Sequence, residues 1–120
     1  KNLKMLDLSE TEVSDLSPLA ELKNLEVLNF DSTPVNDLSP LACLKNLEEL
    51  RLSKTKVSDL SPLACLKNLK RFKLNQTEVR DLSPLADMKS LLYLYLDQTK
   101  VTEEQIEQLK LALPKCKIRR

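Results

Sequence analysis

Apolar residues in this chain recur in a fixed frame, L-x-x-L-x-L-x-x-T-x-V, with a period of 22 positions (33 − 11 for Thr11 and Thr33). Alternation of apolar and polar residues in the L-x-L part predicts a short, half-buried strand in every repeat. A single repeat cannot bury its own leucines, so the repeats are expected to stack and share one core beneath a parallel sheet. The apolar strand positions are Leu3, Leu6, Leu8, Leu25, Leu28, Phe30, Leu47, Leu50, Leu52, Leu69, Phe72, Leu74, Leu91, Leu94 and Leu96.

Each predicted strand is followed by a threonine and, two positions later, a valine, as in Thr55 and Val57. We expect the valine to point into the core. The threonine side chain is expected to hydrogen-bond the backbone of its own turn, and the stacked hydroxyls to form a ladder that satisfies buried amides.

The segment D-L-S-P-L-A recurs four times and predicts a short α-helical or 3₁₀ turn on the side opposite the sheet. In it, serine is predicted to cap the turn and proline to occupy the first helical position, where a missing N–H has no consequence. The residues expected to end these turns are Asn24, Asn46, Asn68 and Ser90, with the asparagines in the left-handed conformation, which the chain must reach without glycine. The aspartates are interpreted as caps rather than as metal ligands: Asp15, Asp37, Asp59 and Asp81.

The fifth repeat departs from this frame. Thr102-Glu103-Glu104-Gln105 has the pattern of a capping box, and Ile106, Leu109 and Leu113 share one face of the helix that it predicts. Pro114 is expected to end that helix, and residues 116–118 to form a last strand or turn. We therefore predict five stacked repeats over residues 1–101, with the first lacking its N-terminal side, and a capping helix with a solvated basic tail over residues 102–120.

Composition narrows the possible functions. The 120 residues include 19 basic and 18 acidic side chains, so no strong overall field favours nucleic acid or a membrane surface. The chain lacks histidine and glycine, which argues against histidine-dependent catalysis and glycine-rich phosphate loops. We expect no enzyme activity, no cofactor, no metal, no nucleic-acid partner and no membrane insertion. No signal peptide is recognised, and an upstream segment is expected because Lys1-Asn2-Leu3 repeats as Lys23-Asn24-Leu25.

The three cysteines are expected to be free thiols. Cys43 and Cys65 fill equivalent places in neighbouring repeats, and stacking would bring their Cα atoms within about 5 Å, inside the disulfide range. The odd number of cysteines and the charged residues in the same column favour exposed, reduced side chains over a bridge, whereas Cys116 is expected to be buried. The sequence leaves the location open: an intracellular protein is slightly favoured, and a surface or secreted protein is compatible with an upstream signal.

The L-x-L, D-L-S-P-L-A and K-N elements together resemble the 22-residue leucine-rich repeats of the bacterial internalin-like family. The resemblance covers residues 1–90. It implies a curved α/β solenoid with a parallel sheet on the concave side, short helical or 3₁₀ segments on the convex side, and a role in protein recognition. We predict a right-handed solenoid with a helical C-terminal cap.

Outward-pointing strand residues change from repeat to repeat, whereas the convex positions are nearly constant within the chain. This internal variation predicts a protein-binding surface with a basic centre and two neighbouring tyrosines, since arginine and tyrosine are frequent in interface hot spots. The alternatives are a structural spacer or self-assembly element, associating end to end through the exposed first repeat, and a face that has drifted without use. The predicted partner-binding residues are Asn29, Asp31, Glu49, Arg51, Arg71, Lys73, Tyr93, Tyr95 and Asp97.

Overall fold

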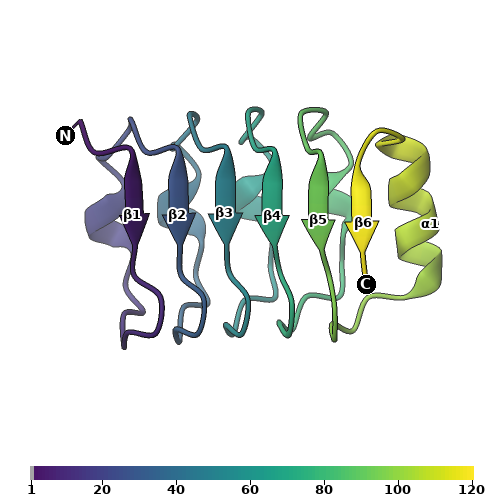
Figure 1. Cartoon of the computed structure of the whole chain (residues 1–120), viewed down its shortest axis with the longest axis horizontal. Coiled ribbons are helices and arrows are strands. Elements are labelled where there is room, and N and C mark those ends of the chain that lie inside the picture. The colour runs from purple at the N-terminus through teal and green to yellow at the C-terminus, as the bar shows by residue number, and fades with distance from the viewer. Residues whose placement is uncertain (1) are drawn as a thin grey trace.

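The computed structural model describes residues 2–120, so the start of the predicted array at Lys1 lies outside it. Six short strands form one parallel sheet in chain order (Figure 1): β1 (Met5–Asp7), β2 (Val27–Asn29), β3 (Glu49–Arg51), β4 (Arg71–Lys73), β5 (Tyr93–Tyr95) and β6 (Lys117–Arg119). Between them lie four 3₁₀ helices and one α-helix: η1 (Ser17–Leu19), η2 (Ser39–Leu41), η3 (Ser61–Leu63), η4 (Ser83–Leu85) and α1 (Glu103–Ala112).

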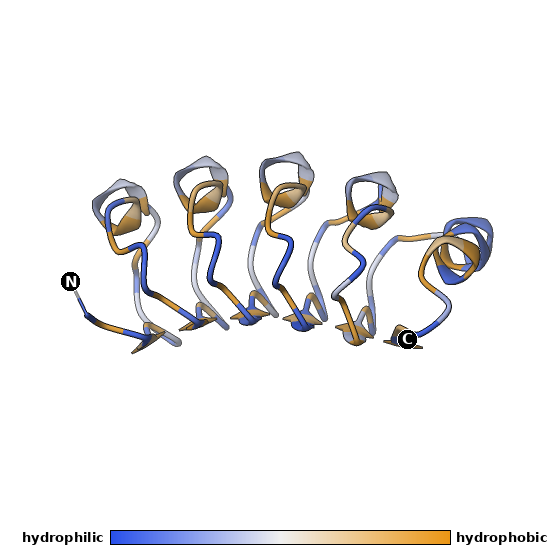
Figure 2. Ribbon diagram, turned by 90° about the horizontal axis from the view of Figure 1, so that it is seen from above, coloured by the Kyte–Doolittle hydropathy of each residue, from blue (hydrophilic) through white to orange (hydrophobic). Residues whose placement is uncertain are grey.

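The sheet and the helices form two layers of a right-handed solenoid. Figure 2 shows the strands along one side and the helices along the other, with the helices spread more widely than the strands. The sheet therefore lies on the concave side, as predicted. No helix within residues 2–120 is long and apolar enough to cross a bilayer.

The 22-residue period sets the register between strands. Each residue of β1 to β4 pairs with the residue 22 positions later in the next strand, as Leu28 pairs with Leu50 and Leu50 with Phe72. These three side chains are fully buried, and so are the valines beside them, including Val35 and Val57. Equal spacing thus places equal side chains in columns, and these columns form one continuous core.

The threonines close their own turns, but the prediction of a hydroxyl ladder was wrong. The hydroxyl of Thr55 donates to the carbonyl oxygen of Leu52 at 2.6 Å, and the threonines of the two neighbouring repeats make the same bond at 2.7 and 2.8 Å. The hydroxyls therefore satisfy carbonyls within one turn. A link between repeats is made instead by asparagine, since Asn68 Nδ2 donates to the carbonyl oxygen of Lys45 at 3.0 Å.

Left-handed backbone occurs at other positions than predicted. The residue with positive φ immediately precedes each threonine, where the chain turns away from the strand. These turns are held across repeats: the amide of Lys54, for example, donates to the carbonyl oxygen of Asn75 at 2.9 Å. Such inter-repeat bonds offset the steric cost of a left-handed non-glycine residue, roughly 1–2 kcal/mol. The five residues are Glu10, Ser32, Lys54, Gln76 and Gln98, in place of the predicted Asn24, Asn46 and Asn68.

The aspartates, and not the serines, cap the 3₁₀ helices. Asp59 Oδ1 accepts the amide N–H of Ser61 at 2.9 Å. Ser61 is itself the first helical residue, so its side chain does not precede the helix as a cap must. The prediction of a serine cap was therefore wrong, and that of an aspartate cap is confirmed. The same contact is repeated at Asp15, Asp37 and Asp81.

Helix α1 packs against η4 and continues the convex layer (Figure 2). Thr102 caps it by accepting the amide N–H of Gln105, and Ile106, Leu109 and Leu113 are buried as predicted. The side chain of Gln105 does not complete the predicted capping box, because its Oε1 accepts the amide N–H of Leu82 at 2.8 Å instead.

A last strand follows α1, as predicted for residues 116–118, but the basic tail is not solvated throughout as expected. Lys117–Arg119 form strand β6, in which Ile118 pairs with Leu94 and packs on the core. Arg120 is also held in place, since it donates to Glu103 and to the carbonyl oxygen of Val101. Two of the basic residues at the end of the chain, Lys117 and Arg119, therefore extend the sheet.

Candidate functional site

The concave face consists of the outward side chains of the six strands. The middle residue of each strand points to the core, so its two neighbours point outward. The strand register places these neighbours in two columns: Met5, Val27, Glu49, Arg71, Tyr93 and Lys117, and beside them Asp7, Asn29, Arg51, Lys73, Tyr95 and Arg119.

Sequence reasoning missed the last member of each column. Lys117 and Arg119 are exposed and pair with Tyr93 and Tyr95. The 22-residue frame does not place them, because α1 changes the spacing between β5 and β6. The available signal was the alternation K-I-R, which matches the Y-L-Y of β5 with its apolar residue inward.

Several residues in or just after the strands hold the turns that follow. Asp31 Oδ1 accepts the amide N–H of Ser53 at 2.9 Å, and Asn29 Oδ1 accepts that of Asp31 at 2.9 Å. The predicted site residues Asn29 and Asp31 therefore have structural duties. Asp97 also receives support, because its amide N–H donates to Asn75 Oδ1 at 2.8 Å, but its side chain is exposed.

Arg51 and Asp31 form an ion pair in the N-terminal half of the face. Both Nε and Nη2 of Arg51 lie 3.1 Å from Asp31 Oδ2, and the two side chains are only 36% and 19% exposed. Such a charge-assisted pair is stronger than a neutral hydrogen bond. Arg51 thus holds the side chain of Asp31 in place, and the carboxylate of Asp31 compensates the positive charge of Arg51.

The tyrosines each lie beside a cation from the preceding strand. The guanidinium carbon of Arg71 lies 5.6 Å from the centroid of the Tyr93 ring, and Lys73 Nζ lies 5.2 Å from that of Tyr95. These distances are within the range of cation–π attraction. Arg71 also lies 3.9 Å from Glu49, at the limit of an ion pair.

Charge is divided along the concave face. Hydrogen bonds from the side chain and the amide of Ser9, helped by the charge of Arg51, lower the pKa of Asp7. That carboxylate is thus ionised at neutral pH, and the N-terminal half of the face keeps its negative charge. The carboxylates of this half are Asp7, Asp31 and Glu49, whereas the cations of β4 to β6 are Arg71, Lys73, Lys117 and Arg119. The C-terminal half also has the exposed carboxylate of Asp97, which follows β5 as Asp31 follows β2.

The capping aspartates lie on the helical side, away from the concave face. Hydrogen bonds from the amide and the side chain of Ser61 lower the pKa of Asp59, and the other three caps follow the same pattern. Each carboxylate therefore accepts the first amide N–H of its own 3₁₀ helix. Within residues 2–120 no group of three or more cysteines and carboxylates is placed to hold a metal ion.

The cysteines lie apart from the concave columns. Cys43 and Cys65 are exposed free thiols, as predicted. Cys116 is buried, also as predicted, and desolvation raises the pKa of its thiol to about 11. A thiol with such a pKa is protonated at neutral pH and is a poor nucleophile.

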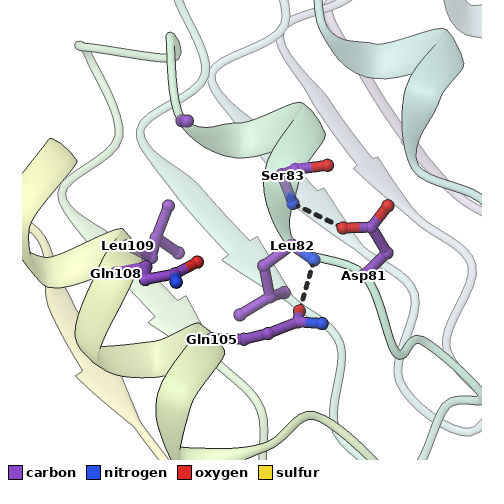
Figure 3. A pocket seen from close by; sticks show the side chains of 7 residues that line it. Asp81, Leu82, Ser83, Gln105, Gln108 and Leu109 are labelled. Atoms are coloured by element: carbon purple, nitrogen blue, oxygen red, sulfur yellow. Dashed lines mark hydrogen bonds between the residues drawn. The ribbon is translucent and has the colours of Figure 1, made fainter.

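A small hollow lies between η4 and α1 (Figure 3), lined in part by Leu82, Gln105 and Leu109. Its volume is about 180 Å³. The side-chain oxygen of Gln105 is occupied by the amide of Leu82, and the carboxylate of Asp81 by the amide of Ser83. These polar groups hold α1 and η4 in place, so the hollow is a packing feature.

Comparison with known proteins gives consistent matches. A family model described as leucine-rich repeats in two copies matches residues 1–43 and 45–87. An internalin (inlF) of Listeria monocytogenes is 29% identical with a TM-score of 0.89 over 98% of this chain, and internalin C2 of the same species is 34% identical with a TM-score of 0.85 over 97%. A leucine-rich repeat protein of Leptospira interrogans, at 23% identity and a TM-score of 0.76 over 99%, shares the fold. The comparison with curated protein sequences gave no match.

The matched structures are longer than this chain, which covers 34%, 51% and 37% of them, respectively. The predicted resemblance to bacterial internalin-like repeats is confirmed. The structural likeness extends beyond residues 1–90, because the alignments cover nearly the whole chain.

Proposed function

Because the chain belongs to the leucine-rich repeat family, we propose that it is a protein-binding module whose concave face contacts a partner protein, with the contacts centred on β4 and β5. Proteins of this family generally serve protein–protein interaction. In this chain the concave face is the surface on which side chains differ from repeat to repeat, while the core columns are kept.

One observation carries the proposal. Tyr93 and Tyr95 lie side by side on β5, each only partly exposed and each next to a cation of β4. Paired rings on a regular sheet present a rigid apolar surface, and little conformational entropy is lost when such side chains are covered. Aromatic and cationic anchors of this kind dominate the energetics of many protein interfaces.

The arrangement suits binding rather than catalysis. The cations of β4 lie against rings or near the carboxylate of Glu49, and the outward columns of the described strands contain neither histidine nor cysteine to act as base or nucleophile. We therefore propose that the module binds its partner without chemical turnover.

The test compares two variants that carry similar changes at different places. Lys73→Glu with Tyr95→Ala changes the concave face, whereas Lys67→Glu with Leu111→Ala removes a cation and an apolar side chain at exposed positions outside the sheet. Affinity capture from a lysate of the source organism or its host is performed with the parent and both variants, after thermal unfolding has shown that all three are folded. A protein retained by the parent and the control but lost from the concave variant supports the proposal. Equal loss from both variants, or from neither, contradicts it.

A second candidate is self-assembly through the edge of β1. Leu3 and Met5 are 43% and 67% exposed, and β1 pairs with β2 alone in the sheet formed by residues 2–120. An open strand edge beside exposed apolar side chains favours pairing with another strand. A mass measured by light scattering that rises with concentration, and no longer rises after Leu3→Glu with Met5→Lys, would support this candidate. A constant monomer mass rules it out.

A further inference from the structure

We propose that β4 to β6 bind an acidic, extended segment of the partner, with two carboxylate side chains three residues apart. The inference rests on the proposed function and specifies the chemistry of the partner. It concerns two rows of the concave face, here called the cation–tyrosine rows: Arg71, Tyr93 and Lys117, and beside them Lys73, Tyr95 and Arg119.

Each row has a tyrosine between two cations. Tyr93 pairs with Arg71 on one side and with Lys117 on the other, and Tyr95 lies in the same way between its two neighbours. Neighbouring strands are about 4.8 Å apart, so the Cα atoms of the two cations in a row are about 9.6 Å apart. The strand bearing each tyrosine thus lies midway between the two strands that bear the cations of its row.

Few carboxylates compensate the positive charge in these rows. Among residues 2–120, no carboxylate lies within ion-pair distance of Lys73, Lys117 or Arg119, and Arg71 reaches Glu49 only at 3.9 Å. Lys117 and Arg119 are moreover exposed to solvent. The rows therefore favour an anionic ligand.

The other arginines near the face are already occupied. Arg51 is held 3.1 Å from Asp31, and Arg120 donates to Glu103 at 2.7 Å. Neither side chain can meet a ligand without giving up its carboxylate. Among the outward strand residues, the positive charge without a carboxylate at close range therefore lies on β4 and β6, on either side of the tyrosines of β5.

The spacing fits an extended peptide. In a polyproline II segment the rise is about 3.1 Å per residue, so side chains three positions apart point the same way about 9.3 Å apart. This nearly equals the separation of the Cα atoms of the two cationic residues in a row. The residues between the two carboxylates then cover the tyrosine, where prolines or other apolar side chains would be favoured.

The rest of the face limits the ligand to a short acidic segment. A long polyanion that continued past β4 would meet the carboxylates of Glu49 and Asp31. With a net charge of +1, the protein also lacks the overall field that nucleic-acid binding draws on. A protein segment whose acidic stretch is short can bind β4 to β6 without placing further negative charge near Glu49 and Asp31.

The test uses a defined peptide, acetyl-Ser-Pro-Glu-Pro-Pro-Glu-Pro-Ser-amide, titrated into the full chain with ¹⁵N-labelled backbone amides observed by NMR. Two matched peptides carry glutamine in place of both glutamates or bring the glutamates two residues apart. We expect saturable shifts confined to β4, β5 and β6 with the first peptide. Binding should be about tenfold weaker with the glutamine peptide and weaker with the shorter spacing.

Variants place the effect on the rows. Lys117→Glu with Arg119→Glu should weaken binding about tenfold, and Lys117→Gln with Arg119→Gln, which is less disruptive to folding, about threefold. Lys67→Glu with Arg80→Glu changes the net charge as much as the first variant, at exposed positions outside the strands, and should leave binding unchanged. Equal effects of the row and control variants overturn the inference.

Two further probes separate the sources of negative charge. A twelve-residue oligothymidylate and a heparin-derived hexasaccharide should bind more weakly than the peptide and fail to displace it. Tighter binding of either probe, or no binding of any peptide, overturns the inference. The proposed function is judged independently by the capture experiment at Lys73 and Tyr95. Loss of capture there, with no acidic-peptide binding, would retain the concave interface and reject this partner chemistry.

Discussion

The core columns and the concave columns of this protein share the same strands but follow opposite rules. Leu28, Leu50 and Phe72 occupy one core column and are fully buried, whereas their neighbours in the outward columns change in charge and size from repeat to repeat. A buried position in a stack must fit the repeats on both sides, so few side chains are accepted there. The inward residue of each short strand therefore contributes to stability, while its outward neighbours set the chemistry of the concave surface.

The largest expected effect comes from opening a core column. Leu50→Ala removes a fully buried side chain from the middle of the stack and should lower the free energy of unfolding by roughly 2–5 kcal/mol. Denaturant titration followed by circular dichroism measures this change. A loss below that of any outward substitution on β3 would mean that its inward and outward faces have been exchanged.

A smaller loss is expected where the turn meets the core. Thr55→Val keeps the shape of a 5% exposed side chain but leaves the carbonyl oxygen of Leu52 without its hydroxyl donor. The cost of such an unsatisfied buried acceptor is about 1–3 kcal/mol. Calorimetry of Thr55→Val and Thr55→Ser would check it, because the serine variant keeps the donor and should recover part of the stability. No recovery with serine would argue against a role for the hydroxyl.

Substitution of Arg51 tests whether an outward residue of β3 also contributes to stability, because its guanidinium holds Asp31 in place. Arg51→Ala should lower the free energy of unfolding by about 1 kcal/mol or less, since the pair is partly exposed and screened by solvent. Asp31→Ala should have a larger effect, because the amide of Ser53 also loses its acceptor. A double-mutant cycle measures the pair, and a coupling near zero would show that Arg51 has no structural part.

The smallest individual effects are expected at the four capping aspartates, through pH. Hydrogen bonds from the following serine lower the folded-state pKa of each carboxyl below its ordinary value of 3.8. Stability from these caps is therefore fully present above about pH 4 and is lost as the pH falls through the lowered folded-state pKa values. Thermal unfolding from pH 6 to pH 2 should show a shallower acid decline when all four are replaced by asparagine. An unchanged slope would contradict this account.

The fold was largely predictable because its signal is repeated. Leucine spacing indicated the stack, the direction of the strands and the buried side of each, and the same alternation assigned residues such as Arg71 and Tyr93 to the concave side. The predictions failed where a position carries no such signal. Left-handed backbone occurs at Lys54 and Gln76, although neither residue type indicates that conformation. Hydrogen bonds between repeats support it at both positions.

Periodicity was enough to set the core and the register, because a 22-residue repeat brings equal side chains into contact in every turn of the stack. The pairing of polar groups, in contrast, was determined only by packing in three dimensions. Gln105 bonds Leu82, Arg51 bonds Asp31, and β6 brings two cations beside the tyrosines. These contacts join residues about one repeat apart through long side chains or a changed spacing, and neither the reach of a side chain nor the position of α1 follows from the repeat length.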